Sequence, residues 1–225
     1  MNNHIANILI LFFLALLLFI YIYSYKSFKY TDEEVCINLY LKNDNKKYKV
    51  LKKIFTKKEC LNIINEGIEY AKNNKWNKKR HDSYPTTDNE ITEEWNNWEL
   101  INKKINKNIF PKIEKLFKLQ KNKLNITELF IVKYDEKGQR ELKYHEDGSE
   151  FSFIITLNDD FTGGGTTFKH NKRNIKPQIG DCLIFSGQNT HKGNYIKSGT
   201  RYILTGFINY IEEDYCENFL NSLFQ

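Results

Sequence analysis

The chain has 225 residues and a formal net charge of +6, with 34 lysines and arginines against 28 aspartates and glutamates. The basic residues are scattered among acidic ones except in the lysine-rich stretch 103–123, which we interpret as a solvated helix face; this pattern argues against a nucleic-acid-binding surface. The four cysteines contain no C-x-x-C pair, which argues against a zinc site.

Residues 5–23 form a nearly unbroken apolar run, in which Asn7 is the strongly polar exception. At a rise of about 1.5 Å per residue, the run is just long enough to span a bilayer core of about 30 Å. A cleaved signal peptide is the alternative, but no basic residue precedes the run and no small-x-small cleavage site follows it. We therefore predict a transmembrane anchor at 1–25, a juxtamembrane linker at 26–47 and a folded domain at 48–225.

The folded domain is expected to begin with a strand at 48–55 and then a helix. Thr56 and Glu59 have the spacing of a capping box, and the helix is expected to end near Asn73. Apolar residues at helical spacing predict its core-facing stripe: Leu61, Ile64, Ile68 and Ala71.

The next stretch, 76–89, is predicted to be irregular, and its His81 is expected at the surface, with contact to substrate as the less favoured alternative. A second helical region is predicted at 91–119, with a break or kink at Pro111. Its apolar stripe is interpreted as core rather than as a binding site: Trp95, Trp98, Ile101 and Ile105.

From Leu124 onward the apolar pattern changes to a period of two. Several short strand-like runs follow, separated by Gly, Asn and Asp, which predicts a sandwich or jelly roll with its core at 124–210. The glycines at 163–165 are interpreted as a tight turn, because no helix signal or G-K-[ST] motif of a phosphate-binding loop follows them. The tail at 212–225 is expected to form a short helix. The fold class is thus mainly β with flanking helices (α+β).

Three residues in the stretch 141–210 belong together chemically: His145, Asp147 and His191. His145 and Asp147 are two apart, so an extended backbone directs both to one face, and a neighbouring strand must bring in His191. Two imidazoles and one carboxylate on one side of a metal are the facial triad of non-haem Fe(II) oxygenases. Arg201 follows on another strand-like run and supplies a cation.

The motifs around these residues carry a family resemblance over about 129–207. In order, they read V-K-Y, H-E-D, F-S-F-I-I-T-L-N, D-F-T-G-G-G-T-T-F, G-D-C-L-I-F, T-H-K-G and G-T-R-Y-I. This order resembles the Fe(II)- and 2-oxoglutarate-dependent dioxygenases of the prolyl/lysyl hydroxylase group, and most of all the lysyl hydroxylase catalytic domain. The fold that the resemblance implies is a double-stranded β-helix.

The resemblance also implies the cofactors and the roles of the site residues. It assigns His145, Asp147 and His191 to Fe(II) as metal ligands and catalytic residues, and Arg201 to the distal carboxylate of 2-oxoglutarate. A guanidinium offers two parallel donors to a carboxylate, which agrees with that role. Tyr134 is a second candidate for contacting 2-oxoglutarate, with packing as its alternative role. Dioxygen is the other co-substrate, and ascorbate is expected as a reductant.

The expected reaction is hydroxylation of a peptidyl lysine or proline, with lysine ahead, and release of succinate and CO2. Arg201 marks the lysyl lineage, because collagen prolyl hydroxylases typically carry lysine there. Asp159 and Asp160 are the candidates for receiving a substrate ammonium, whereas Glu146 is expected on the opposite strand face. The sequence leaves the oligomeric state open.

Two other functions remain as alternatives. One is a nucleic-acid or small-molecule dioxygenase of the same fold. Nucleic-acid demethylases resemble one another in having a second arginine six residues after the first, and Phe207 at that position argues against this function. A non-catalytic jelly-roll binding module is the other, and the intact triad with Arg201 argues against it.

The orientation of the predicted anchor rests on two conflicting arguments. Lys26 and Lys29 follow the apolar run, so the positive-inside rule places the domain in the cytoplasm. Resemblance to collagen-type hydroxylases places it in the lumen of the endoplasmic reticulum, which we favour. Cys36 and Cys216 are candidates for a disulfide in that compartment, while Cys182 is expected in a buried strand.

Overall fold

The computed structural model describes residues 16–21, 46–81 and 83–211. The chain divides into two units, 41–211 and a second one of 1–40 with 212–225. Most of the second unit lies outside the described residues. So do most of the predicted anchor and linker, the predicted tail helix, and both cysteines of the candidate pair Cys36–Cys216. Within the described part, no helix is both long and apolar enough to cross a membrane.

The unit at 41–211 is built on two antiparallel sheets, as the period-two pattern predicted. The larger sheet has the order β1-β9-β5-β11-β3-β2, with β6 also paired to β11. Its strands are β1 (Tyr48–Leu51), β2 (Asp88–Glu90), β3 (Leu124–Asp135), β5 (Phe151–Thr156), β6 (Phe161–Gly163), β9 (Cys182–Ser186) and β11 (Ile196–Tyr210).

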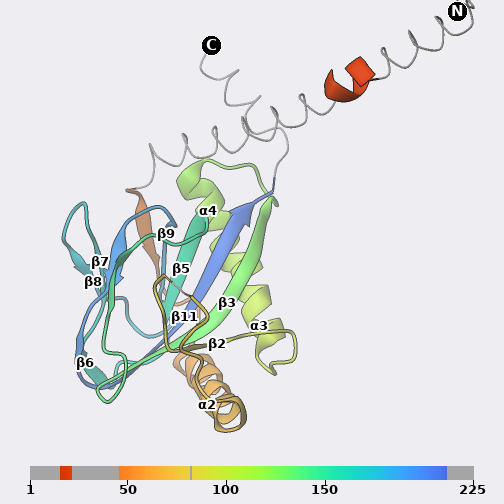
Figure 1. Ribbon diagram of the computed structural model, residues 1–225. Coiled ribbons are helices and arrows are strands. Elements are labelled where there is room, and N and C mark those ends of the chain that lie inside the picture. Colours follow the sequence, from red (N-terminus) through yellow and green to blue (C-terminus); the bar gives the residue numbers. More distant parts are fainter. Residues whose placement is uncertain (1–15, 22–45, 82, 212–225) are drawn as a thin grey trace, which may run out of the picture. The chain divides into compact units, whose positions relative to one another are not determined.

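The smaller sheet has the order β4-β10-β7-β8. Its strands are β4 (Leu142–His145), β7 (Thr166–Phe168), β8 (Asn174–Ile175) and β10 (His191–Gly193). The core between the sheets includes Phe130, Ile154, Phe168 and Phe185, each at most 7% exposed. This is the jelly-roll arrangement, and Figure 1 shows the smaller sheet to one side of the long β3 and β11 strands.

Helices pack on the other face of the larger sheet (Figure 1). They are α2 (Lys57–Asn74), α3 (Trp98–Lys104), a π-helical turn (Ile105–Ile109) and α4 (Phe110–Phe117). In α4, the Phe117 ring lies 4.7 Å from that of Phe151 on β5. The helical region predicted at 91–119 therefore begins only at Trp98, and a π-turn lies just before Pro111. Of its predicted apolar stripe, Ile101 and Ile105 are buried within the helices, Trp95 is buried ahead of them, and Trp98 is half-buried.

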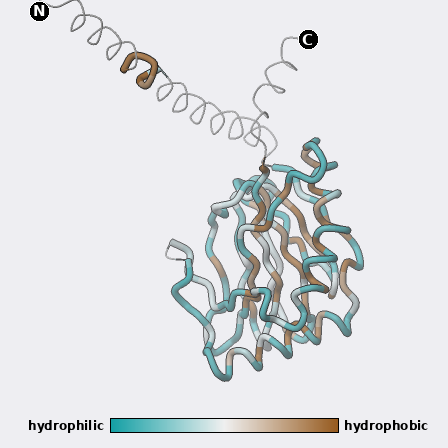
Figure 2. The backbone as a smooth tube through the Cα atoms, turned by 90° about the vertical axis from the view of Figure 1, so that its right-hand side faces the viewer, coloured by the Kyte–Doolittle hydropathy of each residue, from teal (hydrophilic) through white to brown (hydrophobic). Residues whose placement is uncertain are grey.

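Helix α2 begins with the predicted capping box, because Thr56 and Glu59 exchange side-chain-to-backbone hydrogen bonds. The predicted stripe was partly wrong: Leu61 and Ile68 are 55% and 39% exposed. The buried face is instead Cys60, Ile63, Ile64 and Gly67. Its small residues let the helix approach the sheet closely, since a Cβ at Gly67 would lie 3.0 Å from the Ile131 side chain. Figure 2 shows apolar residues concentrated between the helices and the sheet.

The glycine turn at 163–165 is confirmed. All three glycines have positive φ, between 61° and 99°, a backbone region that residues with a Cβ rarely adopt. The turn joins β6 to β7 and thereby carries the chain from the larger sheet to the smaller one. Cys60 and Cys182 are both buried free thiols.

Candidate active site

Adjacent strands of the smaller sheet bring the two predicted histidines together. His145 ends β4, His191 begins β10, and the two are direct partners in the antiparallel ladder. Their ring centroids are 4.3 Å apart. Asp147 follows β4 after one intervening residue, so a single strand pairing assembles all three side chains predicted from the sequence.

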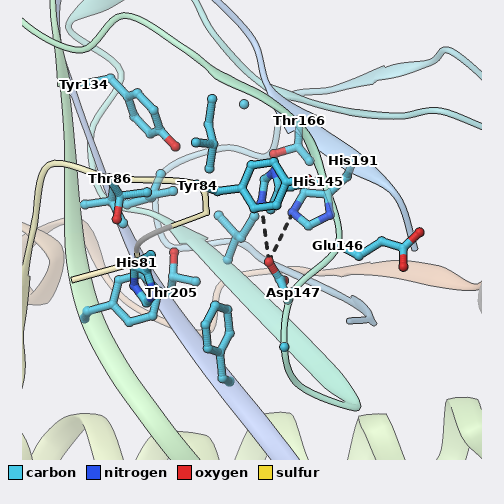
Figure 3. A pocket seen from close by; sticks show the side chains of 18 of the residues that line it. His81, Tyr84, Thr86, Tyr134, His145, Glu146, Asp147, Thr166, His191 and Thr205 are labelled. Carbon is cyan, nitrogen blue, oxygen red and sulfur yellow. Dashed lines mark ion pairs between the residues drawn. The ribbon is translucent and has the colours of Figure 1, made fainter. Parts of the chain in front are cut away.

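The three side chains converge on one point (Figure 3). One ligand atom from each of His145, Asp147 and His191 lies within 4.8 Å of the others. Asp147 Oδ1 is 3.3 Å from Nε2 of His145 and 3.9 Å from Nε2 of His191. Each side chain is at most 8% exposed, so the cluster is shielded from bulk water.

Backbone carbonyls fix the orientation of both imidazoles. His145 Nδ1 lies 2.8 Å from the Lys143 carbonyl oxygen, and His191 Nδ1 lies 2.9 Å from that of Asn189. A carbonyl only accepts hydrogen bonds, so Nδ1 of each ring carries the hydrogen and Nε2 presents its lone pair to the cluster. This is the tautomer that a metal ligand requires.

The charges within the cluster also suit a divalent metal. Burial opposes ionisation of Asp147, but the two histidines and Ser152 hold its pKa below the ordinary value. Burial is the larger influence on His191 and lowers its pKa. For His145, burial is outweighed by the hydrogen bond and charge of Asp147, which raise the pKa. Two imidazole nitrogens and one carboxylate oxygen fit the donor set of a non-haem Fe(II) site.

The triad opens into a cavity of about 390 Å³ between the two sheets. Alternate residues of β11 and their partners on β3 form one wall of it. From the inner to the outer end, the paired residues are Arg201 with Tyr134, Ile203 with Val132, Thr205 with Phe130, and Phe207 with Glu128. Glu128 is the one member of these pairs that is not itself a lining residue.

A buried cation closes the inner end of this cavity. Arg201 is 3% exposed, and its guanidinium hydrogen-bonds the Gly165 carbonyl at a long 3.4 Å. Burial lowers the pKa of Arg201, which reflects the unfavourable desolvation of its charge. A guanidinium in this setting is poised to bind an anion that enters the cavity.

Tyr134 faces Arg201 across the strand pair. Its ring centroid lies 5.5 Å from the guanidinium carbon, and burial raises the pKa of Tyr134 to about 12. The hydroxyl therefore keeps its proton at neutral pH and is able to donate a hydrogen bond.

The outer end of the cavity contains residues that the sequence did not reveal. His81, expected at the surface, lines the cavity, with its ring 5.1 Å from Phe130 and 5.9 Å from Phe207; that expectation was wrong. The Tyr84 ring lies 5.2 Å from His145 and stands in front of the triad in Figure 3. The feature of the sequence that could have indicated these residues is the Y-P-T-T-D segment at 84–88. It leads into β2, which pairs with β3 so that Asp88 lies opposite Val132.

The predicted acidic candidates lie elsewhere. Asp159 and Asp160 are exposed and are not among the cavity-lining residues, so they were wrong candidates for receiving a substrate ammonium. Glu146 borders the cavity, but its carboxylate points away from the triad (Figure 3) and accepts a hydrogen bond from Thr190.

Comparison with known proteins agrees with this geometry. Residues 129–209 match the sequence profile of the 2OG-Fe(II) oxygenase superfamily, where 2OG is 2-oxoglutarate. The chain is a 2OG-Fe(II) oxygenase. It is related, at moderate identity over partial lengths, to procollagen lysyl hydroxylases.

Two relatives illustrate how far the likeness of this oxygenase extends. Human procollagen-lysine,2-oxoglutarate 5-dioxygenase 2 is 41% identical over 85 residues, which are 35% of this chain and 12% of that protein. The procollagen lysyl hydroxylase and glycosyltransferase of Acanthamoeba polyphaga mimivirus is 30% identical over 204 residues, 83% of this chain and 21% of that protein. The oxygenase thus spans a small part of these relatives.

Solved structures share the fold of this oxygenase at low identity. A viral collagen prolyl hydroxylase from Paramecium bursaria Chlorella virus-1 superposes with a TM-score of 0.56 at 20% identity, over 73% of this chain and 96% of that one. A Pseudomonas putida prolyl-4-hydroxylase gives 0.56 at 12% identity, over 80% and 100%. These likenesses support the two-sheet jelly roll, or double-stranded β-helix.

Proposed function

We propose that this oxygenase hydroxylates a peptidyl lysine side chain and converts 2OG to succinate and CO2. The observation that carries the proposal is one cavity with the buried triad at its side and the buried Arg201 at its inner end. The relatives named for procollagen lysine support the substrate class. Peptidyl proline is the second candidate, because the outer wall contains the apolar rings of Phe130 and Phe207, which suit an uncharged ring.

In this proposal, the triad and the inner end of the cavity bind different groups. His145, Asp147 and His191 hold Fe(II), which together with 2OG and dioxygen supplies the oxidising chemistry. Arg201 binds the distal carboxylate of 2OG, and the Tyr134 hydroxyl donates to the same group.

The remaining lining residues shape the space between these groups. Ile203, Val132 and Ile154 contribute apolar surface to the cavity wall. These side chains exclude water, which strengthens the attraction between the guanidinium and a carboxylate.

Charge at the outer end favours lysine over proline. The Arg80 guanidinium is surrounded by three carboxylates: Nε lies 2.8 Å from Asp88, and Nη1 lies 3.1 Å from Glu128 and 3.9 Å from Glu90. Arg80 also reaches His81 at 3.2 Å and so links this cluster to the cavity wall. Three negative charges around one positive charge give this end a negative balance, which attracts an ammonium group.

The decisive experiment is mass spectrometry of collagen-like peptides incubated with the protein, Fe(II), 2OG and ascorbate. The peptides form three groups: one with lysine, one with proline and one with neither. A gain of one oxygen on lysine, lost in His191→Ala, is expected. Oxygen on proline alone would select the second candidate. Oxygen on neither, with steady succinate release on a nucleic acid or small molecule, would refute the peptidyl proposal.

We also propose that residues 5–23 anchor the oxygenase in the endoplasmic reticulum membrane with the folded domain in the lumen. The apolar run supports the anchor, and the collagen-modifying relatives support the compartment. Protease digestion of sealed microsomes tests both: the domain should be protected until detergent is added. Digestion without detergent would place the domain in the cytoplasm, and recovery in the soluble fraction would remove the anchor.

A further inference from the structure

The two carboxylate oxygens of Asp147 have different surroundings. Oδ1 faces Nε2 of both histidines, at 3.3 Å and 3.9 Å. Oδ2 points the other way and accepts a hydrogen bond of 2.6 Å from the Ser152 hydroxyl. The structure therefore distinguishes one oxygen that faces the metal position from one that is held by the protein.

A second hydroxyl orients the first. Ser149 Oγ lies 3.0 Å from Ser152 Oγ. An ionised carboxylate only accepts, so Ser152 uses its single hydrogen on Asp147, and Ser149 must be the donor to Ser152. Both serines are buried, at 6% and 0% exposed, where successive hydrogen bonds polarise and strengthen one another.

The backbone holds this pair of serines rigidly. Ser152 lies on β5, where it pairs with Phe185 of β9 on one side and with Phe207 of β11 on the other. The turn that contains Asp147 and Ser149 is fastened at Gly187, which accepts from the Asp147 amide at 2.8 Å and donates to the Glu150 carbonyl at 2.9 Å.

Gly187 is required for this close approach. A Cβ at that position would lie 1.9 Å from the Ser149 carbonyl oxygen, well inside any permitted contact. The sequence H-E-D-G-S-E-F-S thus forms a turn that leads into β5 and brings Ser149 and Ser152 to the Oδ2 side of the Asp147 carboxylate.

We propose that Ser152, oriented by Ser149, is a positioning residue that keeps Asp147 turned with a single oxygen toward the metal. The inference rests on the proposed iron site. By holding Oδ2, Ser152 prevents the second oxygen from rotating toward the metal and occupying space that 2OG or dioxygen needs. The hydroxyl contacts neither substrate nor metal and acts only through Asp147.

The test is the Fe(II) affinity of variants, measured by anaerobic titration without turnover. Ser152→Ala should bind Fe(II) about 10- to 100-fold more weakly, the usual effect of removing a group that orients a metal ligand. Ser152→Thr keeps the hydroxyl and should recover most of that loss. Ser149→Ala should give a smaller loss, because it removes only the group that orients Ser152.

Ser186→Ala is the matched control. Ser186 lies on β9 opposite Phe151, is 0% exposed like Ser152, and its hydroxyl has no hydrogen-bond partner in the described part of the chain. Removing it deletes the same buried atom without touching Asp147, so iron affinity should stay at the wild-type value. The visible charge-transfer band of the Fe(II)–2OG complex should shift in Ser152→Ala and not in Ser186→Ala.

The outcomes separate this inference from the proposed function. If the wild-type protein binds no Fe(II), the iron site is wrong and the role of Ser152 falls with it. If the wild type binds Fe(II) and Ser152→Ala binds as tightly with an unchanged band, only the positioning role is overturned. Equal weakening in Ser152→Ala and Ser186→Ala would show a general packing effect and would also overturn it. If Ser152→Ala does not fold, the Fe(II) affinities of Ser152→Thr and Ser149→Ala decide: the positioning role requires that Ser149→Ala binds more weakly than the wild type, and unchanged affinity in Ser149→Ala would overturn it.

Discussion

Arg201 and Tyr134 face each other directly across the β11–β3 ladder, with the guanidinium carbon 5.5 Å from the centroid of the phenol ring. Each side chain is 3% exposed, so the cation has a ring beside it in place of water. An aromatic face stabilises a cation by about 2 kcal/mol when both are desolvated. It does not replace a counter-ion, so the inner end of the cavity is suited to receive an anion.

Arg201→Ala should raise the KM for 2OG by about 30-fold or more, since losing one partner of a buried charge pair removes 2 kcal/mol or more of binding energy. The KM of Arg201→Lys for 2OG should lie between those of Arg201→Ala and the wild type, because an ammonium keeps the charge but loses the planar pair of donors. Succinate release at varied 2OG measures both. An unchanged KM for 2OG with a changed KM for peptide would show that Arg201 serves the substrate instead.

Tyr134→Phe isolates the hydroxyl from the ring. The pKa of about 12 means that the phenol is protonated throughout the usual assay range, so its contribution should not vary with pH. Loss of one hydrogen bond should raise the KM for 2OG by about 3- to 10-fold. If the KM stays at the wild-type value while thermal stability also stays unchanged, the ring alone matters and Tyr134 is a packing residue.

His145→Ala and His191→Ala should each abolish iron binding and turnover. The fold should persist, because both strands keep their backbone pairing and the neighbouring core remains. Metal analysis of the purified variants, with circular dichroism to check folding, measures this. For the wild type, a chelator should stop succinate release and added Fe(II) should restore it. Full activity in His191→Ala would contradict the assignment of the triad.

The sequence predicted the parts of the site that depend on local spacing. His145 and Asp147 are two residues apart on one strand end, and the period-two pattern from Leu124 onward indicated the sheets. The chemistry of a facial triad required a second histidine, for which His191 was predicted, and the structure pairs His191 with His145.

What the sequence could not show depends on contacts between distant segments. His81 reaches the cavity because β2 adds to the edge of β3, and no periodicity in the irregular stretch around it indicates that pairing. The buried face of α2 was misjudged for a similar reason: Gly67 is buried by its closeness to Ile131, a contact that hydrophobicity alone does not predict.

Asp181 should stabilise the fold in a pH-dependent way. Its carboxylate accepts from Lys52 Nζ at 2.8 Å and from the amides of Lys53 and Gln178 at 3.0 Å. Burial opposes ionisation, but these donors lower the pKa. Because the folded-state pKa is lowered, the stabilisation is fully present above the unfolded value of about 3.9 and is lost as pH falls through the folded-state value.

Asp181→Ala should therefore lower the free energy of unfolding by about 3 kcal/mol at pH 7. The difference from wild type should shrink as the pH falls below about 4. Urea denaturation at several pH values measures this. A difference that does not change with pH would mean that the loss comes from packing rather than from the ionised carboxylate.

Glu128→Gln should weaken the use of lysine peptides selectively. Glu128 lies opposite Phe207 on the outer rung of the cavity wall, and its carboxylate is 4.0 Å from the His81 imidazole. Removing its charge makes the outer end less negative, so the KM for a lysine peptide should rise by about 3- to 10-fold, more at low salt than at high salt. The KM for 2OG should not change, because Arg201 lies three rungs away.

Glu90→Gln is the matched control. The Glu90 carboxylate is 54% exposed and lies 3.9 Å from the Arg80 guanidinium that Glu128 also contacts, so a smaller effect is expected. Equal changes for lysine and proline peptides in Glu128→Gln would mean that Glu128 supports the wall and does not attract the substrate ammonium.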